Sequence, residues 1–231
     1  MDEIIARLRA VDWELNAGAY RPGGWQKLLA QARNLPRDRR LALAADLSRV
    51  SDKLHLRHGR RTLPFWIGIA GGVLATAGGA VLLSSGLESR SDGAVIAAAV
   101  IWGFTFEPLL KVGTGLLLGV RYSYVYVHGV PRFKMRLGDY LALPRWARIA
   151  LHLSGTIGSP VGVYFVWAFA SPGLPVAARV CAVLFWATLF NVSTLLLWLA
   201  GVRRLAAIVP LRMSSGGAAA QELLEGLGGS G

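Results

Sequence analysis

Two opposite charges, four residues apart, interrupt an apolar stretch in the middle of the chain. Glu107 and Lys111 lie within residues 94–119, which carry no other charged side chain. On a helix this spacing places the acid one turn before the base, the favourable order for an ion pair. Pro108 between them removes a backbone hydrogen bond and predicts a helix kink. Because each charge costs roughly 2.5–3.5 kcal/mol inside a bilayer, the pair is either a functional site or a structural pair that holds helices together.

Two further polar residues in apolar surroundings could do chemistry. His152 could ligate a metal or a porphyrin-type cofactor, although a hydrogen bond to a neighbouring helix is the commoner role of such a residue. Asn191 is expected to make a polar contact between helices. The sequence contains no Gly-x-Ser-x-Gly elbow for a serine nucleophile. We therefore predict no cofactor, no metal and no catalytic residue.

Basic and apolar side chains alternate over residues 132–137, after the aromatic and β-branched run 121–128. These two strand-like segments on either side of Gly129 predict a β-hairpin over 121–137. Arg132, Lys134 and Arg136 then share one face, where they are expected to contact lipid phosphates or a partner.

The composition places these features in a membrane protein. Hydrophobic residues make up 54% of the 231 residues and charged residues only 16%, against about 25% charged in a soluble domain. The mean hydropathy is +0.46. Four apolar runs are each long enough to cross the roughly 30 Å hydrocarbon core as helices, and they cover about 64–83, 94–119, 149–170 and 180–200.

The distribution of Lys and Arg predicts the orientation. The net charge is +12, and the segments 1–63, 84–93, 120–148, 171–179 and 201–231 carry 13, one, six, one and three basic residues. Cytoplasmic loops are enriched in Lys and Arg, so both termini are predicted to be cytoplasmic, in a multi-pass protein of the cell (inner) membrane. Topology thus accounts for the charge, and no nucleic-acid partner is expected.

Outside the spans, helical periodicity covers residues 2–15, 24–34 and 37–58, so residues 1–62 are predicted to form a basic, helical, cytoplasmic region. A four-span membrane domain over 63–212 would include the hairpin, and 213–231 would be a flexible tail. The predicted fold class is an all-α polytopic membrane protein with a small interfacial β-hairpin.

One stretch resembles a known family. Thr105-Phe-Glu107-Pro-Leu-Leu-Lys111 leads into Gly115-Leu-Leu-Leu-Gly-Val-Arg-Tyr122, the hairpin, and a span containing Leu151-His-Leu-Ser-Gly155. This order is similar to the core of site-2-protease-like (M50-type) intramembrane metalloproteases. The resemblance implies a membrane helix with two metal-binding histidines, a β-hairpin and further spans. Here Glu107 and Lys111 replace the histidines, and residues 191–208 contain no acidic ligand, so the resemblance implies a scaffold without its metal.

These observations predict a non-catalytic membrane protein that contacts the lipid bilayer and binds or helps assemble a membrane-protein partner, or forms a homo-oligomer. Two alternatives remain open. One is a small oligomeric ion- or proton-coupled transporter that uses Glu107. The other is an active intramembrane metalloenzyme, which would have to recruit His128, His152 and Asp139.

Overall fold

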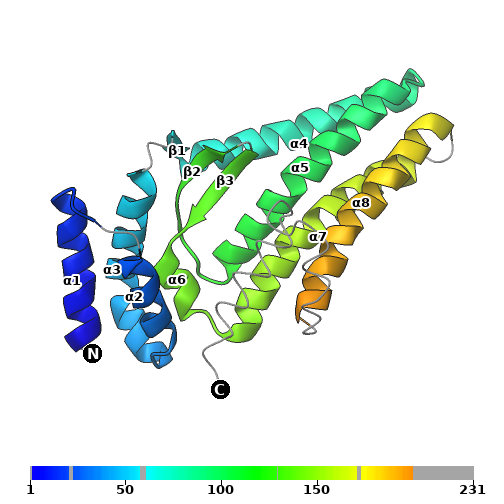
Figure 1. Cartoon of the computed structure of the whole chain (residues 1–231). Coiled ribbons are helices and arrows are strands. Elements are labelled where there is room, and N and C mark those ends of the chain that lie inside the picture. Colours follow the sequence, from blue (N-terminus) through cyan, green and yellow to red (C-terminus); the bar gives the residue numbers. More distant parts are fainter. Residues whose placement is uncertain (1, 21–22, 58–60, 129, 171–172, 200–231) are drawn as a thin grey trace. The chain divides into compact units, whose positions relative to one another are not determined.

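In a computed structural model, the described residues (2–20, 23–57, 61–128, 130–170 and 173–199) are mostly helical and include one small sheet. They divide into two compact units (Figure 1). Of the described residues, unit 1 combines the chain up to residue 65 with 118–148, and unit 2 combines 66–117 with 149–199.

Three helices form the first part of unit 1: α1 (Asp2–Asn16), α2 (Gly24–Arg33) and α3 (Arg37–Leu56). The helical regions predicted from periodicity are confirmed. Their apolar positions are buried together, because each helix turns one stripe inward. These buried residues are Ile4, Leu8 and Val11 of α1, Leu28 and Ala32 of α2, and Leu43, Leu47 and Val50 of α3.

The predicted hairpin is confirmed as β2 (Tyr122–His128) and β3 (Val130–Met135). The sequence did not predict a third strand, β1 (Thr62–Pro64), which pairs antiparallel with β2 and places Leu63 opposite Val125. A short helix, α6 (Leu137–Ala142), follows the hairpin and was also missed. At six residues it is too short to show a helical period in the sequence.

The hairpin clusters with the N-terminal helices rather than with the apolar helices, which differs from the predicted domain boundaries. Two contacts explain this grouping. The sheet order β1-β2-β3 ties the hairpin to the end of the N-terminal region. In addition, the backbone N–H of Gly138 in α6 donates to Ser48 Oγ of α3 at 2.9 Å. The boundary therefore follows contacts between segments distant in sequence, which hydropathy does not record.

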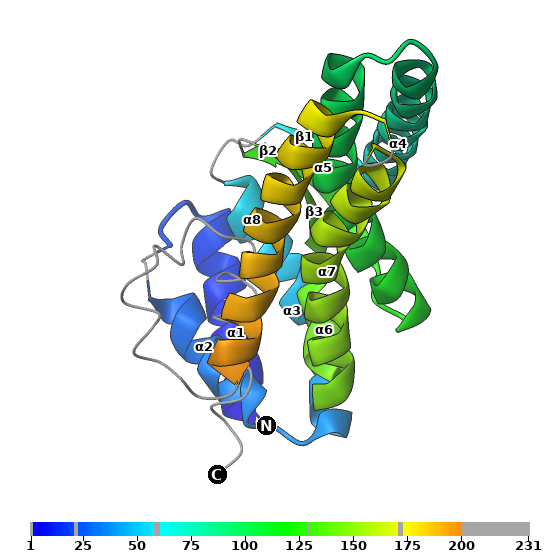
Figure 2. The same ribbon diagram turned by 90° about the vertical axis from the view of Figure 1, so that its right-hand side faces the viewer.

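Unit 2 consists of long apolar helices in two antiparallel pairs (Figures 1 and 2). Helices α4 (Phe65–Glu88) and α5 (Asp92–Leu117) form one pair, and α7 (Arg145–Ala170) and α8 (Pro175–Leu199) the other. Of these, α4, α5 and α7 are long and apolar enough to cross a membrane, while the described apolar part of α8 is the shorter segment 175–190. The predicted tail lies outside the described residues.

A core of small and medium side chains joins the helices of unit 2. It contains Leu83 of α4, Val95, Ala98 and Ala99 of α5, Val166 and Ala170 of α7, Leu174 before α8, and Ala177 and Cys181 of α8. The opposite surfaces are apolar too: Leu74 and Val81 of α4 are 72% and 68% exposed. In α4 only Gly79, Leu83 and Gly86 are buried. Helices that are apolar all round are typical of a membrane environment.

Candidate functional site

The predicted intramembrane acid lies at a contact between α5 and α7. Ser159 Oγ of α7 donates to the backbone carbonyl of Gly103 at 2.7 Å and lies 3.2 Å from Glu107 Oε2, also within hydrogen-bonding distance. Ser159 is 9% exposed, and Glu107 is half-buried. A hydrogen bond to a carboxylate in apolar surroundings partly offsets the cost of burying it. The acid is therefore hydrogen-bonded to the neighbouring helix.

Glycines on α7 allow this close approach. A Cβ atom at Gly158 would lie 2.6 Å from Glu107 Cα, and one at Gly162 would lie 2.8 Å from the Trp102 carbonyl oxygen. At Gly155 it would lie 3.1 Å from Lys111 Cβ. Backbone-to-backbone packing of this kind depends on residues without a side chain. The close contact thus fixes α7 beside both charged residues of α5.

A second polar contact links α4 to α5. Trp102 Nε1 donates to the Thr76 carbonyl oxygen at 2.9 Å, and the Thr76 and Thr105 hydroxyls are hydrogen-bonded at 3.0 Å. Thr76 Oγ1 also donates to the Gly72 carbonyl of its own helix. No sequence pattern marked Thr76, Trp102 or Ser159 as a site residue. Small residues at helical spacing around Ser159 were the available signal, but they cannot reveal which partner a hydroxyl contacts.

Lys111 and Pro108 occupy the expected places within α5. Both are half-buried, and Pro108 is inside the helix. The aliphatic part of Lys111 packs against Gly155 of α7. The Glu107–Lys111 ion pair and the kink at Pro108 remain predictions.

Of the two other polar residues predicted inside the apolar region, His152 has a described side chain and Asn191 does not. His152 of α7 is 1% exposed, and its backbone carbonyl accepts a hydrogen bond from Thr156 Oγ1 at 2.9 Å. The His152 imidazole thus lies in the interior of the unit. The side chain of Asn191 in α8 lies outside the described residues.

Asp139, considered above as a metal ligand, is bound by an arginine instead. Arg121 donates from its backbone N–H and from Nε to Asp139 Oδ2, both at 3.0 Å, and from Nη2 to Oδ1 at 2.9 Å. Burial raises the pKa of Asp139, but these bonds and the charges of Arg121 and Arg136 outweigh it and hold the pKa below its ordinary value. No group of three or more His, Cys, Asp or Glu side chains suited to a metal occurs among the described residues. The His128 side chain lies outside them.

The three basic residues of the hairpin do not behave alike. Arg132 is exposed, whereas Lys134 and Arg136 are half-buried. Lys134 Nζ donates to Ser51 Oγ of α3 at 3.0 Å. A contact of these residues with lipid or a partner remains a prediction, and the Lys134 ammonium already has a protein partner.

Lys134 is one of several groups that contact a polar stripe along α3. Ser123 Oγ donates to Asp52 Oδ2 at 2.9 Å, and the Tyr124 hydroxyl is hydrogen-bonded to His55 Nδ1 at 2.9 Å. The stripe consists of Ser48, Ser51, Asp52 and His55, which share one face because they are spaced by three and four residues. Ser48 contributes the hydrogen bond to Gly138 of α6 described above. The stripe fixes the sheet and α6 against α3.

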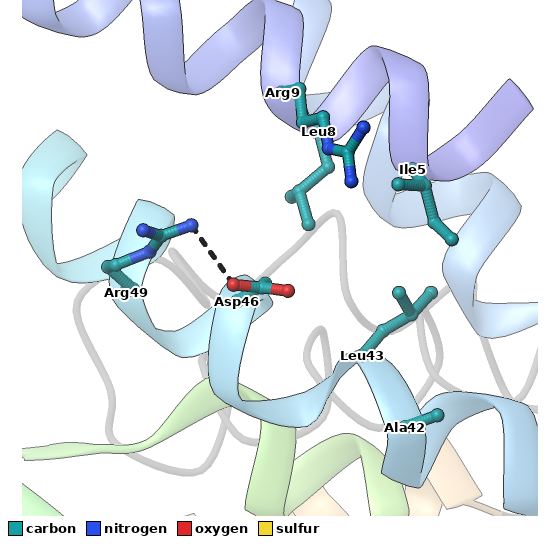
Figure 3. A pocket seen from close by; sticks show the side chains of 7 residues that line it. All are labelled: Ile5, Leu8, Arg9, Ala42, Leu43, Asp46 and Arg49. Atoms are coloured by element: carbon teal, nitrogen blue, oxygen red, sulfur yellow. Dashed lines mark hydrogen bonds and ion pairs between the residues drawn. The ribbon is translucent and has the colours of Figure 1, made fainter. Parts of the chain in front are cut away.

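A cavity of about 420 Å³ lies in unit 1 between α1 and α3. Ile5, Leu8, Ala42 and Leu43 form its apolar part, and Arg9, Asp46 and Arg49 its polar part (Figure 3). Arg49 Nη2 donates to Asp46 Oδ1 at 3.0 Å, which neutralises two of the three charged groups. The volume is in the range of small-molecule sites, but the pairing of Asp46 with Arg49 leaves no distinctive chemistry there.

Comparison of the chain with protein-family models, curated proteins and solved structures gave no match.

Proposed function

We propose that this chain is a non-catalytic, four-span protein of the cell inner membrane that binds or helps assemble a membrane-protein partner. The observation that carries the proposal is the position of Glu107. Its carboxylate lies within hydrogen-bonding distance of Ser159, where Gly158 brings the backbones of α5 and α7 together. A charge placed in such a contact stabilises a helix pair, as expected of a scaffold.

Four spans and a cytoplasmic location of both termini belong to this proposal. Three helices have the length and composition of spans, and we propose the 25-residue helix α8 as the fourth. The positive-inside rule supports the orientation. A reporter inserted at Glu88, the last residue of α4, is expected to read as periplasmic, and one after residue 231 as cytoplasmic. A cytoplasmic reading at Glu88 would overturn the orientation.

We also propose that the scaffold is that of a site-2-protease-like protein whose metal ligands have been replaced. A long apolar helix, a β-hairpin and further apolar helices follow one another in the order that the family implies. Glu107 and Lys111 occupy the positions of the histidines, and Asp139 is engaged by Arg121. Elemental analysis of the purified chain is expected to find no stoichiometric zinc or iron.

The partner would contact the exposed apolar surface of unit 2. Leu74 of α4 and Val183 of α8 are 72% and 68% exposed, so either helix offers a lipid-facing or partner-facing surface. Purification of the full chain from its native membrane in mild detergent is expected to recover a stoichiometric membrane protein. Leu74→Ala and Val183→Ala form a matched pair, and loss of the partner in one of them identifies the helix that binds it. Recovery of the chain alone, or as a homo-oligomer alone, would contradict assembly with a different protein.

A transporter is the second candidate, because a half-buried carboxylate among apolar helices is also a site for a coupled proton or cation. Glu107→Gln separates the two functions, since a glutamine oxygen still accepts from Ser159 but cannot carry a charge. Proton flux into liposomes that contain the protein and a pH-sensitive dye is the measurement. If the chain is a scaffold, neither the wild type nor Glu107→Gln gives proton flux above that of empty liposomes. Flux in the wild type that disappears in Glu107→Gln would establish transport.

A further inference from the structure

Three arginines of unit 1 occupy the first turns of two helices, where acidic residues are favoured, and Asp38 is the one acidic residue in these two turns. Arg37 and Arg40 belong to the first turn of α3, and Arg148 to the first turn of α7. The N-terminal end of a helix carries a partial positive charge, so cations in the first turn are unfavourable. Each helix follows a proline, Pro36 or Pro144, and Pro36 provides no side-chain cap for α3. The local charge is thus strongly positive.

Burial of two of these arginines makes the concentration of positive charge more costly. Arg148 is only 7% exposed. The Nε of Arg40 is buried and has no hydrogen-bond partner within the described part of the chain. A buried donor without a partner typically costs about 1–3 kcal/mol.

The charges of Arg37 and Arg148 both act on the Arg40 guanidinium. Burial, followed by the charges of Arg148 and Arg37, lowers the pKa of Arg40. Arg37 Nε donates to the Ala142 carbonyl oxygen at 3.2 Å, which fixes that side chain beside the loop leading into α7. Between described residues, no ion pair of Arg37 or Arg40 with a carboxylate occurs. Arg37 and Arg40 therefore have no carboxylate partner in this part of the chain.

We propose that Arg37, Arg40 and Arg148 form a binding site for a phosphate group, supplied by a free phosphate anion or by the headgroup of an anionic lipid. Guanidinium groups bind phosphate oxygens through paired, charge-assisted hydrogen bonds. The uncapped backbone N–H groups at the start of α3 add donors of the same polarity. A bound phosphate satisfies Arg40 Nε and removes the repulsion among the three cations. The site is independent of Glu107 and of the proposed partner.

The test uses the purified full chain in a nonionic detergent, with inorganic phosphate as the probe. Thermal unfolding is followed as phosphate replaces chloride at constant ionic strength, so that general screening does not change. Arg40→Gln removes a cluster member. Arg39→Gln, an exposed arginine of the same turn, removes the same charge and is the matched control. Phosphate is expected to raise the melting temperature of the wild type and of Arg39→Gln, with an affinity about tenfold or more weaker in Arg40→Gln.

A second arm identifies the source of the phosphate group. The same three proteins are reconstituted in phosphatidylcholine vesicles with and without phosphatidylglycerol. Stabilisation by phosphatidylglycerol that depends on Arg40 but not on Arg39 assigns the site to a lipid headgroup. Stabilisation by inorganic phosphate alone assigns it to a free anion.

Three results would overturn the proposal. The first is an equal effect of phosphate and chloride on the melting temperature together with no effect of phosphatidylglycerol. The others are a phosphate response of Arg40→Gln equal to that of the wild type, or an equal loss of that response in Arg40→Gln and Arg39→Gln. Without phosphate, Arg40→Gln is expected to be at least as stable as Arg39→Gln, because it relieves repulsion inside the cluster. If Arg40→Gln does not fold, Arg40→Lys retains the charge but not the planar guanidinium and is expected to fold with weakened phosphate binding. An Arg40→Lys response equal to that of the wild type would likewise contradict the site.

Discussion

Arg121 holds Asp139 through three hydrogen bonds, two from its guanidinium and one from its backbone N–H. These bonds connect the residue before β2 to α6. The Asp139 side chain is 11% exposed, whereas that of Arg121 is 67% exposed. The pair thus anchors the end of the hairpin close to α6 at the surface of unit 1.

This pair predicts a loss of stability at low pH. The folded-state pKa of Asp139 lies below its ordinary value, so the folded state binds fewer protons than the unfolded one. The contribution is complete above the unfolded-state pKa of about 3.9 and is lost as the pH falls through the lower, folded-state pKa. Melting temperatures measured from pH 6 to pH 3 are expected to fall less steeply in Asp139→Asn than in the wild type. Glu88→Gln, which removes an exposed carboxylate, is the control, and identical slopes for Asp139→Asn and the wild type would contradict the prediction.

Ser48→Ala is expected to destabilise unit 1. Ser48 Oγ accepts the buried Gly138 N–H at 2.9 Å, and alanine leaves that donor without a partner. The cost is expected to be about 1–3 kcal/mol, measured as a lower free energy of unfolding in denaturant. Ser84→Ala, at an exposed position of α4, is the control. Equal stabilities of the two variants would show that α6 does not depend on this bond.

Gly79→Ala and Gly78→Ala form a matched pair in α4. A Cβ at Gly79 would lie 2.5 Å from Trp102 Nε1, whereas nothing lies within 4 Å of one at Gly78. The Trp102 ring cannot move away without weakening its bond to the Thr76 carbonyl. We expect Gly79→Ala to cost about 1–3 kcal/mol and Gly78→Ala to be neutral or slightly stabilising, since alanine favours the helix. Thermal unfolding in detergent measures both, and a tolerated Gly79→Ala would contradict the packing of α4 on α5.

Asp92 is expected to stabilise the start of α8. Its Oδ1 accepts the backbone N–H of Ala177 at 2.7 Å, so a residue of α5 caps another helix. Asp92→Ala is expected to cost about 1 kcal/mol, while Asp92→Asn retains an acceptor oxygen and costs less. Protease accessibility of the α7–α8 loop, compared between the two variants, is the measurement. Equal cleavage of both variants at the wild-type rate would exclude the cap.

Several features of this protein follow from the sequence by itself. The apolar runs are long and lack charge, so helices α4, α5 and α7 could be predicted within a few residues of their ends. The aromatic and β-branched run 121–128, followed after Gly129 by the alternation of residues 132–137, predicted the β2–β3 hairpin. Both signals are local, because periodicity and hydropathy depend only on neighbouring residues.

The tertiary structure decided which distant residues meet. Ser159 contacts Glu107 because Gly158 removes the side chain that would hold α5 and α7 apart. The grouping of the hairpin with α3 depends on β1 and on the polar stripe, and neither has a period that hydropathy detects. In the sequence, the only signal from Arg37, Arg40 and Arg148 is their contribution to the Lys and Arg counts that predict orientation. They become a cluster only because the fold brings the charges of Arg37 and Arg148 close enough to act on Arg40, which no local pattern records.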